Sequence, residues 1–515
     1  MSLIENIRNY VFNDSITIYW EKGESLPNGV VYQIFCDGIL AGTTDKTHYT
    51  IGNLKAEMGY RLQVQAVYEK DDIKNVNAAE AVAAQELYVY TTAVKEKIDV
   101  TKSPYFAVGD GKTMNTAAIQ KAIDDCKENQ MVYIPKGTFM TGALRLHSDM
   151  ELYLEEGAHL LGTAQINDYL PKIWSRFEGT ELFCYSSLLN LGELNRKGGY
   201  SCKNVIIRGK GTIESGGKEL AKNVIRLERE LMKEKIAALG DEIKQYEKPD
   251  TIPGRVRPRL INMSNCQNIL LEGVTLKNGA CWNIHMIYCN KIVTSNCTVF
   301  SEEVWNGDGW NPDSSNDCTL FNTRFFTGDD SVAIKSGKNP EGNEVNRPCS
   351  KIRVFDCSCA YGHGITMGSE MSGGIDDVKI WDCDMSQSMC GFEIKGTSKR
   401  GGYVRNVHIL DSSCSRIMFH SVGYNNDGIG APVPPVFKDC LFDHVAVRGE
   451  YFDHDRKWYS CDAVELCGFE EKGYEVSNII FRDLNLYEKP NGSSQTISLK
   501  LCENITFERI HCLPR

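Results

Sequence analysis

The feature that most constrains the fold is a short motif that recurs from Cys202 to the C-terminus, at intervals of roughly 22–32 residues. Each copy has a polar turn, often with Asn, then a Val/Ile/Leu-rich strand, a charged or Gly-containing turn and a second strand. Clear copies are "CKNVIIRGKGTI", "CQNILLEGVTL", "CSKIRVFDCSC" and "CENITFERIHC". Such short strands bury their apolar faces only by stacking on the next copy. The repeat therefore predicts an all-β chain whose main part is a parallel β-helix.

Many of the 20 cysteines stand at equivalent places in these copies. At about 4% of 515 residues, cysteine lies below the ~8–10% typical of disulfide scaffolds. No Cys-x-x-Cys pair occurs, so the spacing does not indicate a zinc site. Stacked coils would bury these side chains one above another, and we expect reduced thiols that pack as small hydrophobic groups.

The first 95 residues follow a different pattern. Segments 16–20, 30–35 and 60–67 alternate like strands between Gly- and Asn-rich turns, the spacing of a small β-sandwich. The stretch 47–68 resembles the strand E to strand F region of fibronectin type III domains, with Leu54 and Tyr60 at the family's Leu and corner Tyr. We therefore expect a sandwich over 1–95, a solenoid over 96–515 and, from its Lys/Glu/Leu-rich composition, a helical insertion over 217–250.

Composition and charge exclude several classes. No apolar run approaches the ~18–20 residues that span a bilayer, which argues against a membrane protein. The net charge of −11 argues against a general nucleic-acid binder, which needs a basic surface. The first ten residues carry no secretory signal, so the sequence predicts a cytoplasmic location, or an extracellular one if a signal was removed.

Carboxylates and one histidine recur about one coil apart between residues 310 and 400. Asp313, the pair Asp329 and Asp330, and His363 would line up along the solenoid, because stacked strands lie about 4.8 Å apart. Glycoside hydrolysis requires this combination: one carboxylic acid protonates the leaving oxygen and a carboxylate base activates water. Neighbours on a strand face opposite sides, so the pair shares one face only if a bend intervenes, which Gly328 permits.

The ordered set of motifs resembles glycoside hydrolase family 28, the polygalacturonases. The matching triplets are Asn311-Pro312-Asp313, Gly328-Asp329-Asp330 and Gly362-His363-Gly364, and the resemblance runs through nearly all of the solenoid. It implies a right-handed, pectin-lyase-like β-helix and inverting hydrolysis of α-1,4-galacturonan, with no metal and no other cofactor.

The resemblance also assigns roles. Asp329 would be the general acid, Asp313 and Asp330 would hold and deprotonate the water, and His363 would tune the acid or orient the substrate. The residues expected to bind substrate are Asn311, Lys335, Lys338, Glu393, Lys395, Arg400 and Tyr424.

One position departs from the family. Its Arg-x-Lys motif is Glu393-Ile394-Lys395 here, and a Glu would repel a sugar carboxylate that an Arg would clamp. Either a nearby cation replaces the Arg, or the sugar at this subsite has no free carboxylate. The nearby candidates are Lys338, Lys399 and Arg400.

Several alternatives stay open at this point. Loops "IKSGKNPEGNEVNRP" and "MGSEMSGG" resemble those of bacterial exo-acting members, so exo attack on galacturonan or oligogalacturonides is predicted over endo attack. The competing functions are a hydrolase of rhamnogalacturonan or another modified pectic chain, a calcium-dependent lyase, and a non-catalytic pectin-binding protein. A metal site of Asp313, Asp329 and Asp330 and a homo-oligomer are not excluded.

Overall fold

The computed structural model describes residues 4–23, 30–68, 81–489 and 492–514. Contacts between Cα atoms divide the chain into two compact units, Met1–Glu96 and Lys97–Arg515. Among the described residues, no helix is long and apolar enough to cross a bilayer.

The first unit is a sandwich of two antiparallel sheets, with strand orders β1-β2-β5 and β4-β3-β6-β7. Its core packs the Trp20 ring edge-on against Tyr32, with 5.0 Å between ring centroids. The Tyr60 hydroxyl oxygen accepts the Lys55 N–H at 2.8 Å, the contact that a corner tyrosine makes to the backbone upstream. The strands are β1 (Ile4–Val11), β2 (Ile16–Lys22), β3 (Val30–Cys36), β4 (Ile39–Thr44), β5 (His48–Ile51), β6 (Gly59–Tyr68) and β7 (Ala81–Tyr90).

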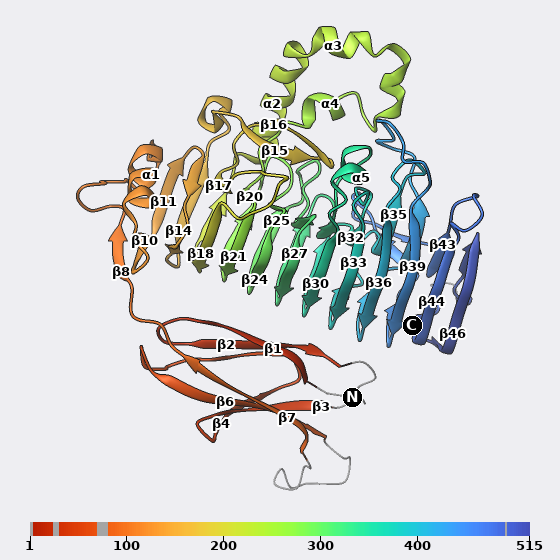
Figure 1. The fold of residues 1–515 in the computed structure, drawn as a ribbon, viewed down its shortest axis with the longest axis horizontal. Helices are drawn as coiled ribbons and strands as arrows, with labels where there is room; N and C mark the ends of the chain where they lie inside the picture. The colour runs from red at the N-terminus through yellow and green to blue at the C-terminus, as the bar shows by residue number, and fades with distance from the viewer. Residues whose placement is uncertain (1–3, 24–29, 69–80, 490–491, 515) are drawn as a thin grey trace. The chain divides into compact units, whose positions relative to one another are not determined.

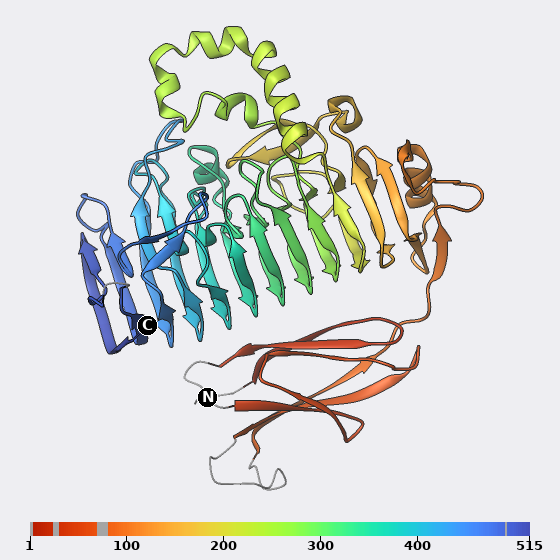
Figure 2. The same ribbon diagram turned by 180° about the vertical axis from the view of Figure 1, so that it is seen from behind.

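The second unit is the parallel β-helix that the repeat predicts (Figures 1 and 2). A 24-stranded sheet wraps one part of each coil. Its strands are β8 (Glu96–Asp99), β9 (Asp110–Met114), β10 (Gln130–Ile134), β11 (Gly137–Thr141), β13 (Met150–Leu154), β14 (Ala158–Gly162), β18 (Cys202–Gly209), β19 (Thr212–Glu214), β21 (Cys266–Glu272), β22 (Thr275–Lys277), β24 (Asn290–Ser295), β25 (Thr298–Ser301), β27 (Asn316–Phe321), β28 (Arg324–Thr327), β30 (Cys349–Phe355), β31 (Ser358–Tyr361), β33 (Ile375–Trp381), β34 (Asp384–Met385), β36 (Tyr403–Leu410), β37 (Ser413–Cys414), β39 (Val436–Asp443), β40 (Ala446–Val447), β44 (Val476–Tyr487) and β46 (Cys502–Leu513).

An 11-stranded parallel sheet closes each coil and carries the polar residues of the predicted site. In spatial order its strands are β12 (Leu144–Leu146), β17 (Leu189–Gly192), β20 (Ile261–Ser264), β23 (Ile284–Ile287), β26 (Trp310–Asp313), β29 (Val332–Ile334), β32 (Gly364–Met367), β35 (Gly391–Gly396), β38 (Ile417–Ser421), β43 (Val464–Cys467) and β45 (Ile497–Lys500).

The Asn of the repeat occupies a turn with left-handed backbone geometry. Asn204, Asn268, Asn406, Asn478 and Asn504 all have positive φ, which Asn tolerates better than most residues. Their side chains also form a ladder between coils, since the Asn268 amide donates to the Asn204 side-chain oxygen at 2.7 Å. The repeated Asn is therefore a turn former that fixes the spacing of coils.

The cysteines pack inside the coils. Cys202 and Cys266 are register partners on adjacent strands, and 15 of the 20 cysteines are buried. All 20 are free thiols. Burial raises the pKa of Cys297 to about 12 and of Cys281 to about 11, so these thiols stay protonated and unreactive.

The segment between β19 and β20 leaves the β-helix as a helical insertion (Figure 1). It contains α2 (Gly217–Leu231), α3 (Lys233–Ala238), the short 3-10 helix η3 (Gly240–Gln245) and α4 (Thr251–Gly254). The remaining elements are the helices α1 (Thr116–Asp125), η2 (Ile166–Tyr169) and α5 (Glu341–Val345), and the two antiparallel hairpins β15 (Ile173–Phe177) with β16 (Thr180–Cys184) and β41 (Glu450–Phe452) with β42 (Trp458–Ser460).

Candidate active site

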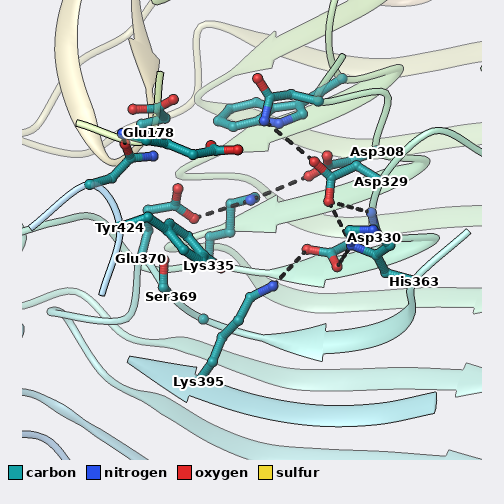
Figure 3. A pocket seen from close by; sticks show the side chains of 15 residues that line it. Glu178, Asp308, Asp329, Asp330, Lys335, His363, Ser369, Glu370, Lys395 and Tyr424 are labelled. Atoms are coloured by element: carbon teal, nitrogen blue, oxygen red, sulfur yellow. Dashed lines mark hydrogen bonds and ion pairs between the residues drawn. The ribbon is translucent and has the colours of Figure 1, made fainter. Parts of the chain in front are cut away.

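A polar cavity of about 170 Å³ is lined mainly by residues of the segments that flank β26, β29 and β32, and by Lys395 of β35 (Figure 3). Most of its charged groups are carboxylates, balanced by two lysines and one histidine. The lining residues are Glu178, Glu247, Trp282, Asn306, Asp308, Asp329, Asp330, Lys335, His363, Gly368, Ser369, Glu370, Lys395, Tyr424 and Asn425.

Asp329 and Asp330 lie in a bend between β28 and β29, not within a strand. A Cβ at Gly328 would meet the Val304 carbonyl oxygen at 2.4 Å, so this close backbone approach requires glycine. The bend frees both carboxylates from strand alternation, and both line the cavity (Figure 3).

His363 connects this pair. Its Nδ1 lies 2.9 Å from Asp329 Oδ1 and 3.5 Å from Asp330 Oδ1, and its backbone N–H donates to the Asp329 carbonyl at 3.0 Å. Gly362 before it has a φ of +131°, and a Cβ there would meet Thr327 Oγ1 at 2.2 Å. The Gly-His-Gly motif thus allows the imidazole to approach the aspartates closely.

The third aspartate of the cavity is Asp308, which the sequence reasoning missed. It lies in the turn between β25 and β26, with 2% of the residue exposed. Lys335 Nζ lies 3.3 Å from Asp308 Oδ2 and donates to Glu370 Oε2 at 3.1 Å. Asn306, two residues earlier, donates to Asp329 Oδ2 at 3.4 Å.

Asp313, predicted to join Asp329 and Asp330, does not line the cavity. It ends β26 with no exposed surface and is bound by Arg176 Nη1 at 2.7 Å, by the Gly337 N–H at 3.1 Å and by His285 Nε2 at 3.3 Å. Burial opposes ionisation of Asp313, but Arg176 outweighs it and lowers the pKa to about 2. Asp313 is therefore part of a buried ion pair beneath the site.

The sequence contains a second Asn-x-Asp triplet, Asn306-Gly307-Asp308, five residues before the one first chosen. This triplet places both its Asn and its Asp in the cavity, whereas Asn311 is fully buried and donates to the Ile284 carbonyl at 3.2 Å. Motif spacing alone did not separate the two triplets. The Gly on either side of Asp308, typical of a turn, was the signal that could have done so.

Some of the predicted substrate-binding residues line the cavity and others do not. Lys335, Lys395 and Tyr424 line the cavity, with Lys395 Nζ 3.6 Å from Asp330 Oδ2. Glu393 does not line it. Glu393 pairs with Lys395 at 3.0 Å and accepts from His420 at 2.6 Å, contacts that hold its pKa well below the usual range against the effect of burial.

None of the three cations considered as substitutes for the family's arginine lines the cavity. Arg400 is buried and donates to the Ser369 carbonyl at 2.9 Å, the Asn425 carbonyl at 3.0 Å and Asn339 Oδ1 at 2.6 Å. Lys338 pairs with Asp427, and Lys399 donates to the Asn426 carbonyl at 2.9 Å. Arg400 therefore binds the backbone of two lining residues, whereas Lys338 and Lys399 bind the two residues that follow Asn425.

One wall of the cavity is formed by the helical insertion and the loop after β38, which contact each other. The Glu247 N–H donates to Asn425 Oδ1 at 3.0 Å, and the Asn426 N–H donates to the Gln245 carbonyl at 3.2 Å. Arg255 Nη1 lies 3.1 Å from Asp427 Oδ2. We infer that these contacts hold Glu247, Tyr424 and Asn425 against one side of the carboxylate cluster.

The electrostatics of the cluster distinguish its carboxylates. Burial, together with Asp329 and Asp330, raises the pKa of Asp308 well above its usual range despite Lys335. Burial also opposes ionisation of Asp329 and Asp330, but His363 outweighs it at Asp329, and Lys395 together with His363 outweighs it at Asp330, so both pKa values are lowered. The cavity therefore combines a carboxyl whose surroundings favour the protonated form with two whose surroundings favour the ionised form, the combination that acid–base hydrolysis uses.

Comparison with known proteins identifies the class. Residues 156–422, just over half of the chain, match the sequence model of Glycosyl hydrolases family 28, and residues 101–155 match one described as Rhamnogalacturonase A/epimerase, pectate lyase-like. The chain belongs to glycosyl hydrolase family 28.

Individual relatives extend over both units. The chain is 27% identical over 561 aligned residues to the Exo-poly-alpha-D-galacturonosidase of Dickeya chrysanthemi, covering 96% of this chain and 88% of that one. It superposes on the family 28 exopolygalacturonase of Yersinia enterocolitica with a TM-score of 0.81 and 23% identity, over 99% of each chain. The exopolygalacturonase of Thermotoga maritima gives a TM-score of 0.67 and 24% identity, over 81% of this chain and 91% of that one.

Proposed function

We propose that this protein is an exo-acting polygalacturonase, which hydrolyses α-1,4-galacturonosyl linkages at a chain end of galacturonan or oligogalacturonides with inversion. The observation that carries the proposal is the gathering of Asp308, Asp329 and Asp330 in one cavity. The wall built by the helical insertion and the loop after β38 supports end-on attack, because it bounds the cavity with Glu247, Tyr424 and Asn425. The alignment with an exo-poly-galacturonosidase over both units supports the same specificity.

In the proposed mechanism, Asp329 protonates the leaving oxygen while Asp308 and Asp330 hold and deprotonate the attacking water. Asp308 takes the role first assigned to Asp313. His363 orients Asp329, and Lys335 and Lys395 offset the negative charge of the cluster and of a bound galacturonate. Tyr424, 36% exposed, presents its ring at the wall, where it would contact the sugar.

The pKa directions support a rival assignment of the acid, because they favour protonation of Asp308 over protonation of Asp329. Asp329→Asn and Asp308→Asn distinguish the two on a 4-nitrophenyl galacturonide, whose leaving group needs no protonation. We expect Asp329→Asn to lose activity on galacturonan yet keep most of it on the nitrophenyl substrate. If Asp308→Asn is the spared variant instead, Asp308 is the acid.

Digestion of a defined galacturonate hexamer tests the exo mode. We expect galacturonate and the pentamer as the first products, and a newly formed reducing end of inverted configuration by NMR. Asp427→Asn removes the carboxylate that joins Arg255 and Lys338 at the wall, and should increase the share of mid-length products. Trimers as the main early product of the wild type would contradict exo attack.

A second candidate, a hydrolase of rhamnogalacturonan or another modified pectic chain, is favoured by one observation. Among the cavity-lining residues described by the structure there is no arginine, and Glu393 stands where the family has one. Assays of Glu393→Arg, with Glu393→Gln as control, compare galacturonan with rhamnogalacturonan I. Higher activity of Glu393→Arg alone on galacturonan would favour the second candidate.

The cytoplasmic location also belongs to this proposal. Twenty unpaired thiols suit a compartment in which cysteines stay reduced, where the enzyme would trim imported oligogalacturonides. Cell fractionation with antibody detection checks this, and recovery of the protein in the culture medium would overturn it.

A further inference from the structure

A second histidine, His454, contacts the histidine of the site. It lies in the turn of the β41–β42 hairpin, and its Nε2 is 3.3 Å from His363 Nε2. Its other nitrogen, Nδ1, lies 3.2 Å from the Tyr361 hydroxyl oxygen, and that hydroxyl donates to the His454 backbone carbonyl at 3.3 Å. His454 does not line the cavity, and the proposed mechanism gives it no role.

Both contacts of the Tyr361 hydroxyl are hydrogen bonds in only one placement of the protons. The His454 carbonyl can only accept, so in this placement it takes the single hydroxyl proton of Tyr361. The Tyr361 oxygen then accepts from His454 Nδ1, which carries a proton. In a neutral His454, Nε2 is therefore bare and accepts, and His363 Nε2 must donate.

The other nitrogen of His363 also carries a proton, because it faces a carboxylate at 2.9 Å. With both nitrogens protonated, His363 is an imidazolium, and the two rings share one positive charge. That charge belongs on His363, since Asp329 and Asp330 adjoin His363 and attract a positive charge there. The pKa directions agree: that of His363 is raised, despite burial, by Asp329, and that of His454 is lowered by burial and by His363.

We propose that His454 is a positioning residue for the hydrolytic reaction, which accepts the Nε2–H of His363 and holds His363 as an imidazolium, whose Nδ1–H supplies the proton that Asp329 passes to the leaving oxygen. The inference rests on the proposed function, because it assumes that Asp329 reacts. The hairpin is suited to this role: the Phe452 ring packs edge-on against Tyr361 at 6.2 Å, and Arg456 pairs with Glu302 at 2.5 Å.

Charged groups approach the histidine pair from several elements. His363 faces Asp329 and Asp330 from the bend after β28 and Cys390 from the segment before β35. His454 faces Asp453 in its own turn and Lys248 from the helical insertion. Arg456 lies over the Tyr361 ring. The aspartates adjoin His363 directly, so they favour the imidazolium there, whereas Lys248 disfavours a charge on His454.

The test replaces the acceptor and follows the pH dependence of kcat/KM on whichever pectic substrate the wild type cleaves. His454→Phe keeps a ring but removes the acceptor, which lowers the pKa of His363. The alkaline limb of the profile should move to lower pH by about one unit, a roughly tenfold loss of kcat/KM on that limb, with KM nearly unchanged. His454→Gln retains an acceptor oxygen and should restore most of the wild-type profile.

Tyr459→Phe is the control, because Tyr459 lies in the same hairpin and its hydroxyl donates to Asp455 Oδ2 at 2.6 Å rather than to either histidine. It should leave the profile unchanged. An alkaline limb that stays at the wild-type pH in His454→Phe, whatever the loss of stability, would overturn the proposal. So would a His454→Gln profile displaced as far as that of His454→Phe. An inactive wild type would instead refute the proposed function and not this contact.

Discussion

Two neighbouring segments, the turn at Asn306–Asp308 and strand β26, carry the same Asn-x-Asp pattern and put it to opposite uses. Asp308 in the turn joins other carboxylates in a cavity, and its pKa is raised. Asp313 in the strand faces Arg176 and His285 in the interior, and its pKa is lowered to about 2. The difference shows that residue type and spacing do not define a catalytic carboxylate. What separates the two aspartates is where the backbone places each carboxylate: in the cavity, or against buried cations in the interior.

The largest expected effect concerns the turn. Asp308→Asn should lower kcat by about 10²–10⁴-fold, the contribution typical of an acid–base group. Its fold should persist with a similar Tm, because Asn keeps the side-chain volume and is uncharged, the form that the raised pKa favours at this position. Steady-state kinetics and thermal unfolding measure both. Full activity in this variant would return the catalytic role to Asp313.

Substitution of Asp313 in strand β26 should instead lower the stability of the fold. Asp313→Asn leaves Arg176 fully buried without its main counter-charge, so we expect a loss of about 3–5 kcal/mol in the free energy of unfolding. The double variant Arg176→Met with Asp313→Asn removes both charges and should recover part of that loss. Urea denaturation of the single and double variants provides the values. A variant of unchanged stability with abolished kcat would contradict the structural role of Asp313.

The fold could be predicted further than the site. The stacked repeats, with their Asn turns and buried cysteines, constrain the backbone at every coil, and the β-helix follows from them. The motifs located Asp329, Asp330 and His363, because Gly328 and Gly362 mark the bends that expose these side chains. The other members of the site could not be found in this way. Glu178, Glu247 and His454 reach it from separate hairpins and insertions, and their convergence depends on tertiary contacts between distant segments.

Acid should weaken the ion pair between Asp313 of strand β26 and Arg176 before it weakens the β-helix as a whole. The folded pKa of Asp313, about 2, lies below the unfolded value of about 3.9, so its stabilisation is present above pH 4 and is lost as pH falls toward 2. At about 1.4 kcal/mol per pKa unit, this difference corresponds to a loss of about 2–3 kcal/mol. Unfolding free energies at pH 5, 4 and 3 should therefore fall more steeply in the wild type than in Asp313→Asn. Parallel slopes would show that the Asp313 carboxyl has the same pKa in the folded and unfolded states.

The smallest expected effect separates hydrolysis from calcium-dependent elimination at the carboxylate cluster. Asp329, Asp330 and His363 place their ligand atoms within 4.8 Å of one another, close enough to hold one cation. Here, however, the Asp329 carboxylate already has the His363 Nδ1–H at 2.9 Å, and Lys395 lies 3.6 Å from Asp330. A divalent ion would have to displace these positive groups. EDTA should therefore leave the rate on galacturonan within about twofold of its value without chelator. Removal of an essential ion would instead lower the rate by about tenfold or more. Inactivation by EDTA, reversed by Ca²⁺ and accompanied by products that absorb in the near ultraviolet, would instead identify a lyase.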